Sequence, residues 1–222
     1  MLNKDFSQIL EQAVFQVFIA CVSETKIESY VVGGFVRDHL LGRKSGSDID
    51  VVSVGSGIDL AKAVQRKLPG ARPVQVFKSY GTAMVQWNDI TLEFVGARKE
   101  SYSEESRNPE VTSGSLEDDQ NRRDFTINAL AISLNDNNTG ELIDPFNGVE
   151  DLKNGIIKTP LDPSITYSDD PLRMLRAIRF ASQLNFEIES RSLNAIKENA
   201  ERIDIITNER IVEELNKILL TS

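Results

Sequence analysis

The chain has 222 residues, of which 40% are hydrophobic and 27% charged, and its formal net charge is −9. This composition is ordinary for a folded globular protein and excludes a nonspecific nucleic-acid coat, which would be basic. No apolar run approaches the roughly 20 residues of a membrane-spanning helix. The single cysteine, Cys21, excludes an internal disulfide, and no basic segment precedes an apolar core as in a signal peptide. We therefore expect a cytoplasmic protein.

Helices and strands alternate in the first half of the predicted structure. Hydrophobic periodicity predicts helices over 4–22, 35–41 and 58–68, and strands over 30–32, 49–54, 74–77, 82–87 and 91–95. The pair Asn88-Asp89 indicates a hairpin between the last two strands. Together these elements predict a small mixed sheet backed by helices.

After residue 100 the sequence is first polar and acidic, and it later becomes mainly helical in its pattern. The polar, acidic stretch 101–121 predicts a flexible loop, which could be a functional lid or a plain solvated excursion. A helix passing into a strand is expected over 124–134, then a short strand at 141–143. Helices follow from Ser168, where Asp170 would cap a helix with Pro171 at its first position; two more are expected over 190–199 and 208–220. We place a domain boundary near residue 146, between a head of residues 1–145 and an all-helical neck of residues 146–222.

Two aspartates spaced Asp-x-Asp, Asp48 and Asp50, open a predicted strand soon after the turn Gly33-Gly34. Residues two apart in a strand point to the same face, and adjacent carboxylates repel unless a cation lies between them. Magnesium accepts carboxylate oxygens and completes its shell with water and phosphate. The glycines would let a phosphate approach the backbone, and Arg37 could bind it bidentately. Each motif alone is common on surfaces, but their combination predicts a magnesium and phosphate site.

This arrangement resembles the nucleotidyltransferase superfamily that includes DNA polymerase beta. It is more closely similar to the head of class II tRNA nucleotidyltransferases (CCA-adding enzymes) and bacterial poly(A) polymerases. Three later blocks carry the same resemblance, namely Arg122-Arg123-Asp124-Phe125-Thr126, Asp169-Asp170-Pro171-Leu172-Arg173 and Glu209-Arg210-Ile211. The resemblance implies an α+β fold, with a DNA polymerase beta-like head and a small mixed sheet followed by a helical neck.

The resemblance also implies roles for the carboxylates. Asp48 and Asp50 would bind Mg²⁺ and act as catalytic residues. Glu93, in the predicted strand 91–95, would help hold the metal or accept the proton of an attacking hydroxyl. An ordinary solvent-facing glutamate fits the alternation equally well.

Nucleotide-binding roles follow from the other blocks of the resemblance. Arg123, Asp124 and Asn128 would hold the sugar and phosphates, although a capped helix start explains the same residues. Asp170 and Arg173 would read the base edges of CTP and ATP, because arginine donates and aspartate accepts; the alternative is a cap with an i,i+3 ion pair. Arg176 could bind phosphate or lie on a solvated face.

The implied activity is template-independent addition of CMP and AMP to the 3′ end of tRNA through two metal ions. A poly(A) polymerase and an enzyme that adds only CC or only A stay open. So do transfer to a small hydroxylated molecule and a non-enzymatic nucleotide- or RNA-binding module. Because the family usually continues into body and tail domains, we expect a truncated chain with weakened tRNA binding. The sequence leaves the oligomeric state open.

Overall fold

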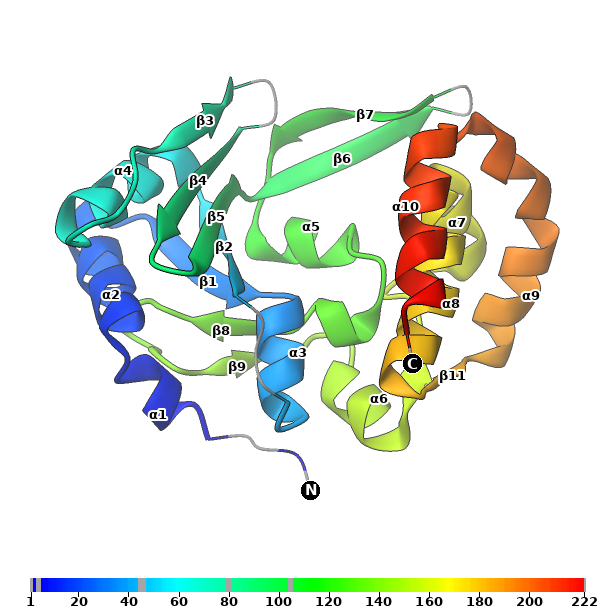
Figure 1. The fold of residues 1–222 in the computed structure, drawn as a ribbon, viewed down its shortest axis with the longest axis horizontal. Coiled ribbons are helices and arrows are strands. Elements are labelled where there is room, and N and C mark those ends of the chain that lie inside the picture. Colours follow the sequence, from blue (N-terminus) through cyan, green and yellow to red (C-terminus); the bar gives the residue numbers. More distant parts are fainter. Residues whose placement is uncertain (1, 3–4, 44–46, 79–80, 104–105, 222) are drawn as a thin grey trace. The chain divides into compact units, whose positions relative to one another are not determined.

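The computed structural model describes residues 2, 5–43, 47–78, 81–103 and 106–221, and of residues 100–110 only the backbone. Two compact units are present (Figure 1). The first comprises residues 1–99, 112–120 and 130–145, and the second comprises residues 100–111, 121–129 and 146–222. A division between Pro145 and Phe146 coincides with the boundary expected from the sequence, but two earlier segments also belong to the second unit. The domain limits of 1–145 and 146–222 stay a prediction.

A sheet of seven strands forms the first unit, in the order β3-β4-β5-β2-β1-β8-β9. The strands are β1 (Glu28–Val32), β2 (Asp48–Val54), β3 (Gln75–Phe77), β4 (Thr82–Trp87), β5 (Ile90–Gly96), β8 (Ala131–Ser133) and β9 (Leu142–Ile143). Strands β2 and β5 are parallel, whereas β1 is antiparallel to both β2 and β8. The predicted hairpin is confirmed as β4 and β5, and Asn88 turns it with a φ of 52°.

The sheet is accompanied by helices α1 (Ser7–Leu10), α2 (Ala13–Thr25), α3 (Gly34–Leu40) and α4 (Gly57–Lys67). The single helix predicted over 4–22 is wrong, because Gln12 adopts an extended conformation and begins α2 afresh. Residue 4, where that prediction began, lies outside the described residues. Helix α4 starts where the Ser56 hydroxyl accepts a hydrogen bond from the Asp59 backbone N–H, which satisfies one of the open amides of the first turn.

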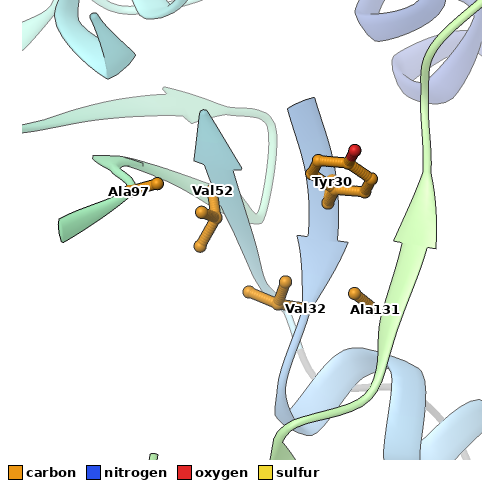
Figure 2. Close-up of a cluster of buried hydrophobic side chains, with 5 residues drawn as sticks. All are labelled: Tyr30, Val32, Val52, Ala97 and Ala131. Carbon is orange, nitrogen blue, oxygen red and sulfur yellow. The ribbon is translucent and has the colours of Figure 1, made fainter. Parts of the chain in front are cut away.

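Alternating residues of the central strands are buried on both faces of the sheet. On one face Phe94 of β5 meets Phe18 of α2 edge to face, with ring centroids 5.8 Å apart. On the other face a cluster of buried hydrophobic side chains packs together, as Figure 2 shows: Tyr30, Val32, Val52, Ala97 and Ala131. Each fully buried side chain of valine or phenylalanine size contributes about 1.5–3 kcal/mol. This two-sided burial fixes the register of β2, which carries the aspartates.

Residues 101–121 do not form the predicted loop. Strands β6 (Arg98–Ser103) and β7 (Ser106–Ser113) pair in a small sheet, and α5 (Leu116–Asn121) follows. Helix α5 begins with reciprocal hydrogen bonds, in which Asp118 accepts from the Ser115 backbone N–H and the Ser115 hydroxyl accepts from the Asp118 backbone N–H. Local backbone pairing and this capping box order a polar segment, although residues 104–105 lie outside the described part.

Short helices dominate the second unit: α6 (Gly148–Asn154), α7 (Pro163–Asp169), α8 (Leu172–Leu184), α9 (Ser190–Glu198) and α10 (Asn208–Leu219). Helix α8 packs against α7 and α10, and α7 packs against α9. Two-residue strands β10 (Ile156–Ile157) and β11 (Glu187–Ile188) pair in parallel, so the unit is not purely helical. The helix predicted from Asp124 is only a 3₁₀ turn, η2 (Thr126–Asn128). No helix in the described ranges is long and apolar enough to cross a bilayer.

Candidate active site

The three predicted carboxylates lie on one face of the sheet in the first unit. Asp50 of β2 is in register with Glu93 of β5 across the parallel pair. Asp48, two residues before Asp50, shares its face because side chains alternate along a strand. Asp48 is exposed and Asp50 is partly buried. The structure therefore brings together the aspartates and the glutamate that the sequence singled out.

The two aspartates affect the titration of Glu93. Partial desolvation, followed by the negative charges of Asp50 and Asp48, raises the pKa of Glu93 above its usual value. In the part of the chain that the structure describes, no three or more His, Cys, Asp or Glu side chains are placed to hold a metal ion together. Two neighbouring carboxylates are ligands of the kind that a hard divalent cation takes, with water and phosphate oxygens filling its other positions.

The Gly33-Gly34 turn joins β1 to α3. Gly33 has a φ of 75° and a ψ of −136°, a conformation that a residue with a Cβ rarely adopts. Its N–H donates to the carbonyl oxygen of Leu130, at 3.3 Å, so Gly33 provides the turn. A Cβ on Gly34 would stand 3.6 Å from Nη2 of Arg37. The surface beside Gly34 and Arg37 is thus the part of the turn that a phosphate could approach.

Arg37 is nearly buried, and it already has a bidentate partner. Its Nε and Nη2 atoms donate to the two carboxylate oxygens of Asp38, at 2.9 and 3.1 Å. The sequence suggested a bidentate contact between Arg37 and a phosphate, whereas this fork holds Asp38. Any phosphate at Arg37 would have to share the guanidinium with that carboxylate.

In the second unit, Arg123, Asp124 and Asn128 form a closely bonded segment. The Arg123 side chain donates to the backbone carbonyl of Asn128 at 3.1 Å, and the Asn128 amide donates to Oδ1 of Asp124 at 3.0 Å. Asp124 and Asn128 are 8% and 6% exposed. The three predicted residues therefore lie together, and much of their hydrogen bonding is internal.

Asp124 also pairs with Arg176 of α8. Nε and Nη2 of Arg176 donate to Oδ2 of Asp124 at 2.8 and 2.5 Å. Burial alone would raise the pKa of Asp124, but the Arg176 charge, the hydrogen bond from Asn128 and the Arg173 charge outweigh it and hold the pKa at about 2. Asp124 is therefore ionised at neutral pH despite its burial.

Asp170 and Arg173 stand at the start of α8, but among the described contacts they form no ion pair. Oδ1 of Asp170 accepts a hydrogen bond from the Leu172 backbone N–H at 3.2 Å, so Asp170 caps the helix. Pro171 takes the N-cap position and not the first helical position that the sequence suggested. Arg173 donates from Nη1 to the carbonyl of Thr166 at 3.4 Å and from Nη2 to that of Arg122 at 2.7 Å. The other donors and acceptors of this pair can serve a ligand.

A cavity of about 400 Å³ connects these residues within the second unit. It is lined by Arg122, Arg123, Asp124, Asp170, Leu172, Arg173, Arg176, Arg210, Glu213, Glu214 and Lys217. The last four belong to α10, which sequence analysis did not place in a site. These four polar residues are spaced i, i+3, i+4 and i+7, so they lie on one face of the helix. That spacing is the sequence signal that could have placed them in the site.

Two protein-family models match this chain. The model of the poly A polymerase head domain matches residues 29–158, which is more than half of the chain. The chain belongs to the poly A polymerase head domain family. This confirms the family and the α+β fold that the motifs predicted. A second model, described as a probable RNA and SrmB-binding site of polymerase A, matches residues 185–222 and includes α10.

Curated relatives of this head domain protein are similar over most of its length. It is 41% identical to a CCA-adding enzyme of Anoxybacillus flavithermus over 99% of this chain and 51% of that one. It is 43% identical to an A-adding tRNA nucleotidyltransferase of Aquifex aeolicus over 81% of this chain and 21% of the relative. The chain thus spans about half or less of the length of these relatives.

Solved structures agree with the fold. A CCA-adding enzyme in complex with CTP superposes with a TM-score of 0.82 at 34% identity, covering 100% of this chain and 51% of that one. The Thermotoga maritima CCA-adding enzyme in complex with tRNA gives a TM-score of 0.81 at 34% identity, over 100% of this chain and 52% of that one. Both likenesses extend over the head and over the helices that follow it.

Proposed function

We propose that this chain carries the nucleotide-transfer site of a template-independent RNA nucleotidyltransferase, which adds CMP and AMP from CTP and ATP to the 3′ end of tRNA. The observation that carries the proposal is the register of Asp50 with Glu93, with Asp48 on the same face, in a head domain of this family. The similarity to CCA-adding enzymes, and the complexes of similar enzymes with CTP and tRNA, support these substrates.

Magnesium is the metal that we assign to Asp48 and Asp50. Two neighbouring carboxylates whose charges raise the pKa of Glu93 form a site that favours a divalent cation. Bound there, one or two magnesium ions would lower the pKa of the attacking hydroxyl and stabilise the leaving phosphate oxygens. Family members of this kind generally use a divalent metal, and its identity as Mg²⁺ belongs to the proposal.

In the proposed reaction the 3′ oxygen of the RNA forms a bond to the α-phosphorus of the nucleotide. The bond from that phosphorus to the oxygen that bridges to the β-phosphate breaks, and pyrophosphate leaves. Glu93, whose raised pKa makes it a stronger base than an ordinary carboxylate, would accept the proton of the 3′ hydroxyl. Gly34 and Arg37 would hold the triphosphate, and Gly33 would supply the turn that presents them.

Base selection is assigned to the cavity of the second unit. Asp170 offers carboxylate acceptors and Arg173 offers guanidinium donors, which together can match the edges of cytosine and adenine. Arg173 is held by two backbone carbonyls, so its donors have a fixed direction. Arg123 and Arg176 add positive charge for the phosphates or the sugar.

A second function is favoured by one comparison. The A-adding relative from Aquifex aeolicus shares 43% identity with this chain, so addition of AMP alone to a tRNA that already ends in CC is the nearest alternative. A poly(A) polymerase would use the same site on other RNA. A non-enzymatic module would bind nucleotide without transferring it. A cytoplasmic location remains part of the proposal.

The deciding experiment is nucleotide incorporation in magnesium buffer by the purified chain and by the Asp48→Asn variant. The substrates are tRNA transcripts that lack CCA or end in CC, offered with CTP, ATP or both. Addition of CC and then one A supports the proposal, and addition of A to the CC-ended transcript alone supports the A-adding alternative. A ladder of adenosines on unrelated RNA supports a poly(A) polymerase. Incorporation that survives in Asp48→Asn would contradict the metal assignment.

If the chain extends none of these RNAs, calorimetric titration with CTP and ATP distinguishes two cases. Binding without extension supports the module that binds nucleotide and transfers nothing. Absence of binding overturns the assignment of the nucleotide site itself.

A further inference from the structure

A second cavity, of about 370 Å³, lies in the first unit, away from the carboxylate face. Glu28 lines it and begins β1, whereas Val32 at the other end of this strand is in register with Asp50. Four residues of strand span about 13 Å, so the cavity is separate from the candidate active site. Its volume lies within the range of about 300–1,000 Å³ of pockets that hold small ligands.

Two carboxylates of the lining are held in place by the chain itself. Glu28 accepts a hydrogen bond from the hydroxyl of the buried Tyr30. Burial, followed by this hydrogen bond and the Glu28 charge, raises the pKa of the Tyr30 hydroxyl, so the hydroxyl keeps its proton and donates. Oδ2 of Asp136 accepts from the Ser23 hydroxyl at 3.1 Å and from Nζ of Lys26 at 3.3 Å. Within the described contacts, the other oxygen of each carboxylate is left for a ligand.

The charges around this cavity favour a cation. Lys26 is the basic side chain of the described lining, and its ammonium group is already paired with Asp136. Glu28 adds a second carboxylate to the lining, and the negative charge of Glu141 also acts on Tyr30. Negative charges therefore outnumber the positive one, and an anion would be repelled.

The spread of the carboxylates points to an extended ligand and not to a single ion. Among the described residues, no three or more acidic, His or Cys side chains converge to hold a metal. Glu28 comes from β1 and Asp136 from the turn after β8, so they stand on different elements. A flexible molecule whose ammonium groups are joined by methylenes can reach both carboxylates. Val22 and the Tyr30 ring give the lining apolar surface for the methylenes, and the Asn137 amide offers a further acceptor.

We propose that this cavity binds an extended organic cation of the polyamine class, whose ammonium groups pair with Glu28 and Asp136. The site is distinct from the proposed nucleotide-transfer site and needs neither RNA nor nucleotide. The bound cation would connect α2, β1 and the turn after β8, and it would stabilise the first unit by mass action.

Calorimetric titration of the full chain with spermidine in low-salt buffer measures the binding, because salt screens exposed charges. The variants Glu28→Gln and Asp136→Asn remove one charge each and keep an acceptor for the Tyr30 and Ser23 hydroxyls. We expect each to raise the dissociation constant by about two- to fivefold, the range of an exposed ion pair. The double variant should lose roughly the product of the single losses.

Two controls separate this site from general attraction to an acidic chain. Glu150→Gln removes a charge from the exposed pair with Lys153 in the second unit and should leave the dissociation constant unchanged. The Asp48→Asn/Asp50→Asn variant removes the carboxylates of the candidate active site, and spermidine binding should persist in it. Putrescine should bind more tightly than butylamine, which has the same carbon chain and a single ammonium group.

Lys26→Met gives a result of opposite sign. It removes the cation that competes for Asp136, so spermidine should bind more tightly than in the wild type. If the cavity instead took an anion, inorganic phosphate would bind to the wild type and lose affinity in Lys26→Met, and that outcome would overturn the proposal.

Thermal unfolding checks that each variant is folded, and Lys26→Met decides the sign if the double variant is not. The proposal also fails if the wild-type chain does not bind spermidine. Equal dissociation constants in the wild type and in Glu28→Gln/Asp136→Asn would place the polyamine elsewhere. None of these results depends on nucleotide transfer, so the proposed function and this site stand or fall separately.

Discussion

Asp50 and Glu93 stand side by side on the parallel strands β2 and β5, with their Cα atoms in register and their side chains on one face. Asp48 adds a third carboxylate to this face. The energetic consequence is visible in Glu93, whose pKa is raised by partial desolvation and by the charges of Asp50 and Asp48. A fold that gathers like charges in this way loses some stability unless a cation offsets them.

We therefore expect magnesium to stabilise the folded chain. Adding MgCl₂ should raise the melting temperature of the wild type, because the cation binds the folded carboxylate face and not the unfolded chain. The Asp48→Asn/Asp50→Asn variant should melt higher than the wild type in EDTA and respond less to magnesium. Thermal unfolding, with KCl at equal ionic strength as the control, measures both effects. An equal magnesium response in the variant would place the cation elsewhere.

The raised pKa of Glu93 predicts a dependence of stability on pH. A carboxyl whose folded pKa exceeds its unfolded pKa stabilises the folded state at low pH, and this contribution is lost as the pH rises through the folded value. Glu93→Gln should thus match the wild type in acid and become the more stable protein above the raised pKa. Urea unfolding in EDTA across the weakly acidic range measures the difference. A constant difference at all pH values would contradict it.

For Asp124 we predict that stability depends on pH in the opposite direction, and in a more acidic range. Its pKa is held at about 2, below the ordinary aspartate value of 3.8. Its stabilising contribution is therefore complete above the unfolded pKa and is lost as the pH falls from there towards the folded value. Asp124→Asn should be less stable than the wild type at neutral pH, and the gap should narrow in this acidic window. Fluorescence-detected acid unfolding, with Glu150→Gln as the exposed control, tests the sign.

The two glycines of the turn should respond differently to alanine. Gly33→Ala forces a Cβ onto a φ of 75° and a ψ of −136°, and such backbone strain costs roughly 1–3 kcal/mol. Gly34→Ala places its Cβ 3.6 Å from the Arg37 side chain, an ordinary contact, so stability should change little. The new methyl would nevertheless obstruct a phosphate at Arg37. We expect lower stability for the first variant and weaker nucleotide binding for the second, measured by urea unfolding and calorimetry.

Most strands of the head sheet could be predicted, because their sequences show hydrophobic alternation or a recognisable motif. Val31, Val51 and Phe94 are buried on one face, and Asp48 and Asp50 stand on the other, so alternation and the Asp-x-Asp motif gave both strand and orientation. The pairing of β2 with β5 is a tertiary feature. Sequence reasoning could only state that it would bring Glu93 to the aspartates, and the observed register does so.

Other features of the structure have no clear pattern in the sequence that would predict them. Residues 98–103 and 106–113 pair as two strands of mainly polar sequence, and hydrophobic alternation cannot indicate a ladder formed by backbone groups. The spacing of Ser115 and Asp118 is that of a capping box and could have predicted a helix start, but the acidic composition around it favoured a loop. The fork from Arg37 to Asp38 joins adjacent residues, yet its geometry depends on rotamers that spacing does not determine.

A last prediction concerns the buried ion pair between Arg179 of α8 and Glu214 of α10. Nη1 of Arg179 lies 3.1 Å from the Glu214 carboxylate, with side chains that are 10% and 5% exposed. Arg179→Met leaves a buried carboxylate that still pairs with Lys217, at 3.3 Å. Breaking such a pair costs roughly 3–5 kcal/mol, and Lys217 should hold the loss near the lower limit.

The double variant Arg179→Met/Glu214→Leu should recover much of that loss, because it replaces the pair with apolar side chains and leaves no buried charge alone. Glu150→Gln, at the exposed pair with Lys153, should change the free energy of unfolding by less than about 0.5 kcal/mol. Urea unfolding of the three variants measures these differences. If Arg179→Met were no more destabilising than Glu150→Gln, the pair would not join α8 to α10, and the cavity wall formed by α10 would need another support.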